Sequence, residues 1–535
     1  MSGAFKESLV EQAALEWLAD VGYQTLYGPN IAPGGEGPQL RDSLADVVLI
    51  DRLVPMVRAL NKGVEPAVID QALKRVFRSE SQNSIDENYR LHRFLIEGVP
   101  VEYRGTDGQT RTIRVRLIDF ETPEANDWLA VNQFTVAKDG KKRRPDIVCF
   151  VNGLPLSLFE LKNPADENAD MRGAWNQIQT YRRDINTIFT YNALTVISDG
   201  VASATMSSFA GAFEHYAPWK TIDGRQIVTE RPALEVLIRG VFEPKRFLDI
   251  LRNFVVFSDE TITDKATGQP MRSLVKRVAK YHQYWAVNTA VESTVKAAGP
   301  QGDKRGGVVW HTQGSGKSFE MVFYAAKIMR DPRMANPTVV FITDRNDLDD
   351  QLFGETFAPA TILPERPVQA TNRAHLRDLL KVSSGGIIFT TLQKFAPEEQ
   401  GDINPVLTDR RNVIVVADEA HRSQYGFGET LDSKGRLKAG LAKHMRDALP
   451  GATCLGFTGT PIETTDKSTR AVFGDYIDIY DLTRAVEDGA TVKIYYEPKR
   501  VKVGISETIH AERDELADEI TETGEGSAAT AAKSR

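Results

Sequence analysis

The sequence contains little cysteine, no long apolar segment and no excess of basic residues, and each shortage excludes a class of protein. Its two cysteines, Cys149 and Cys454, are too few for a disulfide framework or a cysteine-rich metal site. No stretch of about 18 uninterrupted apolar residues is present, so we expect no membrane-spanning helix. The first residues lack the basic and apolar parts of a secretion signal, and we predict a cytoplasmic protein. The net charge of −7 gives no general sign of nucleic-acid binding, although an acidic protein can carry a basic channel.

The length of 535 residues is too great for one ordinary core, and at roughly 100–200 residues per domain it predicts about two to four domains. Residues 1–255 contain short β-type runs separated by turn signals such as Asn152-Gly153, so we expect an α/β domain with a mixed sheet. Residues 256–500 contain short, apolar, β-branched runs that alternate with helix-length segments, which is typical of a buried parallel sheet. We expect an acidic, partly disordered tail over residues 501–535.

A glycine-rich loop lies between an apolar strand and a helix, and it consists of Gln313, Gly314, Ser315, Gly316, Lys317 and Ser318. Its glycines let backbone N–H groups point at phosphate oxygens, next to the positive end of the helix. In such a loop Lys317 reaches the β- and γ-phosphates of ATP and Ser318 ligates Mg²⁺. The strict pattern has glycine where this chain has His311, a departure that suits helicase-type loops.

Two carboxylates, Asp418 and Glu419, follow the apolar run Val413–Ala417 about a hundred residues later. An acidic pair after a strand can do no more than cap a helix in some proteins. Because a phosphate loop is also present here, we expect Asp418 to hold the Mg²⁺ of ATP and Glu419 to polarise the attacking water.

Together these motifs resemble those of superfamily 2 helicases. Motifs I, Ia, II and III and the next DNA-facing motif are matched by Thr312–Ser318, Phe341–Arg345, Asp418–His421, Thr458–Pro461 and Thr390–Gln393. Gln283 stands where this family reads adenine, and its amide can both donate and accept a hydrogen bond. The resemblance implies a RecA-like domain that binds nucleotide through Gln283, Thr312, Gln313, Gly314, Ser315, Gly316, Lys317, Ser318, Asp418, His421, Thr458, Gly459 and Thr460.

A second constellation precedes the first in the chain. Asp146 begins one strand-like run, and Glu160 and Lys162 end the next one, so that in a hairpin Glu160 and Lys162 point to the same face. Asp146 and Glu160 could then bind Mg²⁺ while Lys162 orients water. This resembles the PD-(D/E)xK nuclease core, and Gln177 and Tyr181, four residues apart on a helix, match the Q-xxx-Y helix of a subset of these nucleases.

Other interpretations of this region remain open. A Glu-x-Lys strand is also common as a surface ion pair. The basic run of Lys138, Lys141, Lys142, Arg143 and Arg144 is either a solvated hairpin or an edge that contacts phosphates. Glu7 and Glu11 on the first predicted helix are candidate acidic ligands, but we expect them to be solvated.

A PD-(D/E)xK nuclease followed by a superfamily 2 motor resembles the R (restriction, motor) subunit of type I restriction-modification enzymes. The resemblance implies ATP-driven translocation of double-stranded DNA, Mg²⁺-dependent cleavage of unmethylated foreign DNA, and a complex with methyltransferase (M) and specificity (S) subunits. It also implies motifs IV to VI beyond residue 500, which this sequence lacks, so we expect that the second RecA-like lobe is absent and that the chain hydrolyses ATP poorly alone. The alternatives are a standalone ATP-dependent nuclease of repair or defence, and a catalytically incomplete module that docks on the methyltransferase complex.

Overall fold

The computed structural model describes residues 7–105, 108–162, 171–263, 268–343, 352–395, 406–420, 429–431, 437–439, 441–460 and 467–492. Contacts divide the chain into Met1–Thr491 and Val492–Arg535, and of the second part only Val492 is described. The predicted tail over 501–535 therefore lies outside the described residues. Among the described helices, none combines the length and apolar character needed to cross a membrane.

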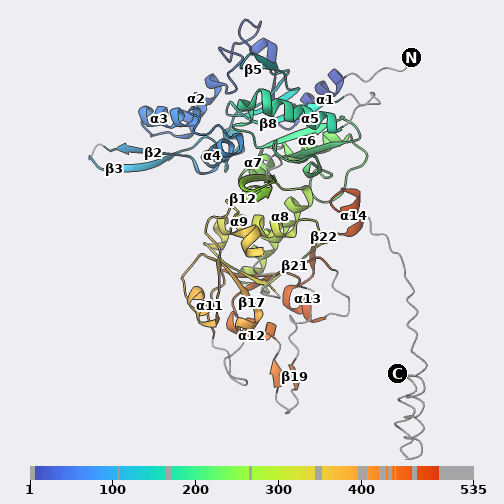
Figure 1. Ribbon diagram of the computed structural model, residues 1–535. Helices are drawn as coiled ribbons and strands as arrows, with labels where there is room; N and C mark the ends of the chain where they lie inside the picture. Colours follow the sequence, from blue (N-terminus) through green and yellow to red (C-terminus); the bar gives the residue numbers. More distant parts are fainter. Residues whose placement is uncertain are drawn as a thin grey trace, which may run out of the picture. The chain divides into compact units, whose positions relative to one another are not determined.

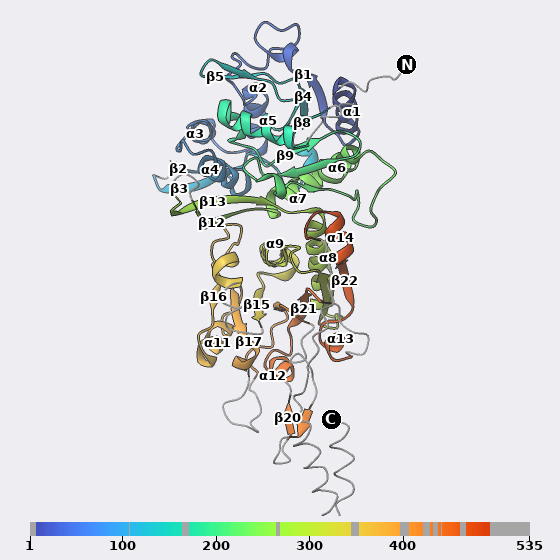
Figure 2. The ribbon, with the colours of Figure 1, turned by 45° about the vertical axis from the view of Figure 1, so that its right-hand side comes forward.

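The N-terminal half is built on a seven-stranded sheet (Figures 1 and 2). In spatial order its strands are β1 (Gln24–Tyr27), β4 (Trp128–Asn132), β7 (Ile147–Val151), β8 (Leu154–Leu161), β9 (Leu194–Ser198), β10 (Ala204–Ser207) and β11 (Ala217–Pro218). Strand β8 pairs antiparallel with β7 and parallel with β9, so the predicted mixed sheet is confirmed. Two hairpins accompany it, β2 (Val99–Arg104) with β3 (Thr110–Val115) and β5 (Val136–Lys138) with β6 (Lys141–Arg143).

Helices α1 (Glu7–Asp20), α5 (Met171–Asp184) and α6 (Ala233–Val241) pack against strands of this sheet, and α5 carries part of a predicted site. The same half contains the helices α2 (Ile50–Leu60), α3 (Pro66–Phe77), α4 (Ser84–Glu97) and α7 (Pro244–Asn253). In α5 the buried residues Ala174, Ile178 and Tyr181 recur every three or four positions, so one face of the helix packs on the sheet.

The turn between β7 and β8 fixes the register of the central hairpin. Asn152 and Gly153 both have positive φ, 52° and 79°, as a two-residue hairpin loop requires. A Cβ on Gly153 would lie 2.5 Å from the Leu49 carbonyl oxygen, so only glycine fits there. The predicted Asn-Gly turn is confirmed, and it places Ile147 opposite Phe159.

The C-terminal half contains a second seven-stranded sheet, in which all recorded pairings are parallel. Its spatial order is β16 (Val368–Gln369), β17 (Ile387–Thr391), β15 (Thr338–Thr343), β18 (Val413–Ala417), β21 (Thr453–Thr458), β14 (Arg305–His311) and β22 (Tyr476–Tyr480). Four of these strands, β15, β17, β18 and β21, are buried at every residue, as their apolar runs predicted. The predicted parallel-sheet domain is confirmed.

Helices pack against this sheet, and the buried apolar residues around it form two separate hydrophobic clusters. One cluster includes residues of α8 (Tyr281–Ala298) and α9 (Lys317–Arg330), and it continues into the N-terminal half. The other includes residues of α11 (Arg373–Leu380), α12 (Leu441–Ala448) and α13 (Lys467–Phe473). The short strands β19 (Glu429–Leu431) and β20 (Leu437–Ala439) form a hairpin of their own, and α14 (Leu482–Glu487) follows β22.

A long hairpin, β12 (Val255–Thr263) with β13 (Pro270–Val278), joins the two halves. On one side, the buried Lys276 ammonium donates to Asn88 Oδ1 at 2.9 Å and to the Asn192 carbonyl oxygen. On the other side, the Thr361 amide donates to the Phe257 carbonyl oxygen at 2.9 Å. The strands of this hairpin contact both halves, and the domain boundary between residues 255 and 256 stays a prediction.

Candidate nuclease and nucleotide sites

The two predicted nuclease carboxylates lie together on the central hairpin. Asp146 directly precedes β7 and Glu160 lies near the end of β8, and the hairpin register brings them to neighbouring positions on adjacent strands. Asp146 Oδ2 accepts a hydrogen bond from the Leu161 amide at 2.7 Å. Both side chains are buried, with exposed fractions of 6% and 4%. Buried carboxylates without a role are unusual, because ionised groups are costly to remove from water.

Glu160 is held by two further predicted residues. Lys162 Nζ donates to Glu160 Oε1 at 2.7 Å, and the Tyr181 hydroxyl donates to Glu160 Oε2 at 2.8 Å. Gln177 hydrogen-bonds the Tyr181 side chain in turn. Burial, with the charges of Glu160 and Asp146, raises the pKa of Tyr181 well above its usual value, so its hydroxyl stays protonated. The structure thus brings all five predicted nuclease residues together, while their catalytic roles stay predictions.

The oxygen atoms of this cluster suit a hard divalent cation. Mg²⁺ prefers carboxylate ligands and retains several waters, and Asp146 and Glu160 supply two carboxylates next to each other. Lys162 contacts Glu160, and its own side chain is 27% exposed, so it is the member of this ion pair that reaches solvent. The donor set therefore fits Mg²⁺.

Glu11 on α1 is buried, whereas the sequence predicted a solvated helix residue. It is 9% exposed. Its two carboxylate oxygens accept from the side-chain amides of Asn132 and Gln133. The Gln133 backbone amide donates to the Asp146 carbonyl oxygen at 2.8 Å, which links Glu11 to the nuclease cluster. The side chain of Glu7 lies outside the described residues.

The basic run on the β5–β6 hairpin divides into two groups. Lys141 and Arg143 pair with Asp184 at the end of α5, at 2.9 and 2.6 Å. Asp184 also accepts from Arg183, and these cations hold its pKa well below the usual value. Lys142 and Arg144 are exposed. Part of the run is therefore an anchor for the hairpin, and the other part faces solvent.

The phosphate loop connects the end of β14 to the start of α9, as predicted. Gly314 and Gly316 have φ of 86° and 94°, in the left-handed region that favours glycine. Lys317 Nζ donates to the His311 and Thr312 carbonyl oxygens at 3.1 and 3.4 Å. Gly459 in the motif III region is close to the same ammonium, because a Cβ at Gly459 would lie 3.0 Å from Lys317 Nζ.

The order β18–β21–β14 places three predicted motifs in a row at the carboxyl ends of the strands. Asp418 and Glu419 follow β18, and Thr458–Thr460 end and follow β21. Asp418 Oδ1 accepts from the Glu419 amide at 2.9 Å, and Glu419 has a φ of 50°, which is uncommon for a residue with a side chain. His421, Pro461 and the end of the motif Ia match lie outside the described residues.

Gln283 contacts the phosphate loop from helix α8. Its Oε1 accepts from the Lys280 amide at 2.9 Å, and its Nε2 donates to the Ser315 and Gly316 carbonyl oxygens at 3.4 and 3.3 Å. A Cβ on Gly316 would lie 2.6 Å from that Nε2, so the second glycine makes the contact feasible. Adenine reading by Gln283 stays a prediction, and in this structure its amide bonds the loop.

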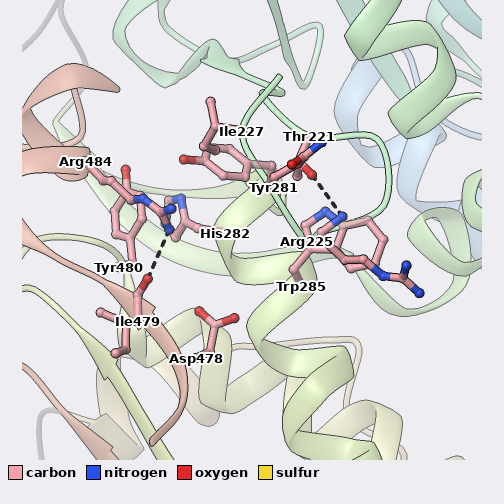
Figure 3. A pocket seen from close by; sticks show the side chains of 12 residues that line it. Thr221, Arg225, Ile227, Tyr281, His282, Trp285, Asp478, Ile479, Tyr480 and Arg484 are labelled. Carbon is pink, nitrogen blue, oxygen red and sulfur yellow. Dashed lines mark hydrogen bonds between the residues drawn. The ribbon is translucent and has the colours of Figure 1, made fainter. Parts of the chain in front are cut away.

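A pocket of about 380 Å³, partly open to solvent, lies beside this helix terminus (Figure 3). It is lined by Thr221, Gly224, Arg225, Gln226, Ile227, Tyr281, His282, Trp285, Asp478, Ile479, Tyr480 and Arg484. The Tyr281 and Tyr480 hydroxyls both donate to Asp488 Oδ2 at 2.7 Å. His282 Nε2 donates to the Ser315 carbonyl oxygen at 3.1 Å, which connects the pocket wall to the phosphate loop.

The sequence did not predict that His311 lies between two carboxylates. Its side chain is fully buried, and its ring nitrogens contact Glu320 of α9 and Asp478 of β22, each at 2.8 Å. Burial lowers its pKa, but the two carboxylates outweigh burial and raise it to about 9. His282 and Glu320 lie close enough to His311 to suggest a metal site, but both His311 nitrogens are already bonded to carboxylates.

Comparison with known proteins matches both halves of the chain. The family profile described as type I restriction enzyme R protein N terminus matches residues 4–212, and that of the SWI2/SNF2 ATPase matches residues 282–529. The chain is 42% identical over 526 residues to the type I restriction enzyme HindI endonuclease subunit of Haemophilus influenzae, covering 97% of this chain and 48% of that protein.

A second relative is provisionally named as the type I restriction enzyme MjaIXP endonuclease subunit of Methanocaldococcus jannaschii. It is 32% identical over 544 residues, which cover 96% of this chain and 48% of that protein. The chain thus spans about half the length of these relatives. The solved SWI2/SNF2 ATPase core of Sulfolobus solfataricus aligns with a TM-score of 0.25 and 15% identity over 36% of this chain and 34% of that one, a similarity too low to establish a shared fold.

Proposed function

Because this chain belongs to the family of type I restriction enzyme endonuclease subunits, we propose that it is the part of such an R subunit that cleaves DNA and binds ATP. The observation that carries this proposal is the cluster of Asp146, Glu160, Lys162 and Tyr181 on the N-terminal sheet. The phosphate loop belongs to the same compact unit, Met1–Thr491. We assign to the whole subunit the translocation of double-stranded DNA and assembly with methyltransferase and specificity subunits.

In the nuclease site, Asp146 and Glu160 would hold Mg²⁺. The bound ion would polarise the scissile phosphate and acidify a water. The chain's own contribution is orientation: Tyr181 fixes one oxygen of Glu160 while Lys162 holds the other, so the carboxylate has one direction. The Lys162 side chain reaches solvent, where it can bond the attacking water or the phosphate.

In the nucleotide site, Lys317 would exchange two loop carbonyls for the β- and γ-phosphates. Ser318 and Asp418 would hold the Mg²⁺ of ATP, and Glu419 would orient the attacking water. We assign the nucleoside to the pocket beside Tyr281 and His282, because its wall contacts the phosphate loop through the bond between His282 and the Ser315 carbonyl oxygen.

The test is ATP hydrolysis by the purified chain with Mg²⁺ and long double-stranded DNA, alone and then with its cognate methyltransferase complex. We expect turnover to require DNA and that complex, and Lys317→Ala to abolish it. Lys381→Ala removes a lysine that is 71% exposed and should have no effect. Nucleotide binding and DNA cleavage are measured in the same samples. Cleavage without the complex would favour a standalone nuclease, and nucleotide binding without cleavage in either case would favour a docking module.

A further inference from the structure

His311 stands where the strict phosphate-loop pattern has glycine, at the start of the loop, but its side chain points away from the side that would bind phosphate. It is 0% exposed and lies between two carboxylates from different elements. Each ring nitrogen faces a carboxylate oxygen. An ionised carboxylate can accept hydrogen bonds but cannot donate them. This arrangement favours the doubly protonated imidazolium, in which both nitrogens donate, and the two carboxylates accordingly raise the pKa of His311 to about 9.

The two partners connect three separate parts of the site. Glu320 lies in the first turn of α9, so its bond to His311 closes a ring across the whole phosphate loop, from its first residue to its helix. Asp478 lies on the edge strand β22, which leads to α14. The His311 carbonyl oxygen also accepts from Lys317 Nζ at 3.1 Å. One residue thus contacts the loop's helix, its lysine and the neighbouring strand.

The other groups around His311 support a fixed charge there. His282 of α8 lies 5.6 Å away between ring centroids, and Tyr480 of β22 stacks on His282 at 3.9 Å. Burial and the nearby His311 charge lower the pKa of His282 to about 3, so this second ring stays neutral. Of the two imidazoles in the cluster, only the one between the carboxylates carries a proton charge at neutral pH.

We propose that His311 is a positioning residue for nucleotide binding, a charged brace that joins the two ends of the phosphate loop through Glu320 and ties them to strand β22 through Asp478. The inference rests on the proposed ATP site and adds how that site is held in shape. Without the brace, the Lys317 contact to the His311 carbonyl oxygen still joins the two ends of the loop, but Lys317 leaves that contact when it turns to the phosphates. The loop then spends less time in the conformation that binds phosphate. Its apparent affinity for the nucleotide falls in proportion to the fraction of molecules in that conformation.

The sign of the pH effect follows from the raised pKa. The charged brace is present below a pH of about 9 and is lost as the pH rises through that value. If only the protonated form binds, the dissociation constant for the nucleotide rises about tenfold one pH unit above the midpoint. At neutral pH the brace is permanent, so affinity should be flat between pH 6.5 and 8.

The experiment measures the dissociation constant of a fluorescent ATP analogue with Mg²⁺ across pH 6.5 to 10, using the whole chain. We expect the wild type to weaken at alkaline pH and His311→Gln, which has no titratable ring, to bind more weakly at pH 7 with no such break. Asp478→Asn removes one carboxylate and should move the break to lower pH. Asp475→Asn, whose side chain is 85% exposed on the same segment, should leave it in place.

Each outcome decides a different question. A wild type that binds no nucleotide overturns the proposed ATP site and this inference with it. Nucleotide binding with the same pH profile in wild type and Asp478→Asn overturns the brace alone. Should His311→Gln fail to fold, the pH at which Asp478→Asn loses nucleotide affinity still tests the brace. If His311 only filled space in the core, replacing Asp478 would not shift the midpoint of that pH dependence.

Discussion

Replacing Tyr181 by phenylalanine tests whether the nuclease site depends on the orientation of Glu160. The substitution removes a hydroxyl that donates to Glu160 Oε2 at 2.8 Å and keeps the ring, which is 2% exposed. Hydrogen bonds to charged groups contribute about 1.5–3 kcal/mol. If that energy keeps Glu160 in its catalytic direction, its loss corresponds to a cleavage rate about 10- to 150-fold lower.

The assay is single-turnover cleavage of supercoiled plasmid with Mg²⁺ and ATP, by the chain assembled with its methyltransferase complex. Tyr191→Phe is the matched control, because Tyr191 is also buried but its hydroxyl donates to the Val76 carbonyl oxygen at 3.2 Å. Tyr181→Phe loses hydrogen bonds to Glu160, Gln177 and the Arg144 carbonyl oxygen, whereas Tyr191→Phe loses its bond to the Val76 carbonyl oxygen. The melting temperature should therefore fall in both variants, and further in Tyr181→Phe. Only Tyr181→Phe should lose cleavage.

The loss should also be independent of pH. The pKa of Tyr181 is raised by burial and by Glu160 and Asp146, so the hydroxyl remains a donor throughout pH 6 to 9. A Tyr181→Phe rate within twofold of wild type, with Tyr191→Phe equally active, would refute the reasoning. A loss that grows or disappears across this pH range would show that Tyr181 acts as an acid or base and does not position Glu160.

Three further outcomes are expected. Gly224→Ala places a Cβ 2.4 Å from the half-buried Trp285 ring, whereas Gly34→Ala meets nothing within 4 Å although φ is positive at both. Differential scanning calorimetry should show that Gly224→Ala lowers the free energy of unfolding by about 1–3 kcal/mol more than Gly34→Ala does. Replacing exposed Lys142 and Arg144 by alanine should lower the slope of log affinity for DNA against log salt by about 1 each, and an unchanged slope would show a solvated edge. Glu419→Gln should bind the ATP analogue as wild type does and lose hydrolysis; retained turnover would assign the water-orienting role elsewhere.

The sequence predicted those parts of the molecule that depend on local patterns. The β7–β8 hairpin follows from two apolar runs and an Asn-Gly pair that adopts positive φ, and its register places Asp146 beside Glu160. Tyr181 joins them because positions 177 and 181 share one helical face. The parallel sheet follows in the same way from short apolar runs with turn signals between them.

Contacts across long stretches of chain were not predictable in this way. Glu11 meets Gln133 at a separation of 122 residues, and a helix pattern does not say which face another element will cover. Asp478 meets His311 at a separation of 167 residues, so the sequence showed only that glycine was replaced. The anchoring of Lys141 and Arg143 by Asp184 likewise depends on how α5 ends against the hairpin.

The buried Lys276 ammonium sets where this chain can be recombined with its relatives. A chimera that joins a foreign nuclease at residue 255 would keep Lys276 on β13 but replace Asn88, whose side-chain oxygen accepts from it, and the segment that presents the Asn192 carbonyl oxygen. Burial lowers the pKa of Lys276 well below its usual value, and without those acceptors the chimera would bury an unsatisfied amine. Gene exchange within the family should therefore pass on the β12–β13 hairpin together with the nuclease, as one inherited block.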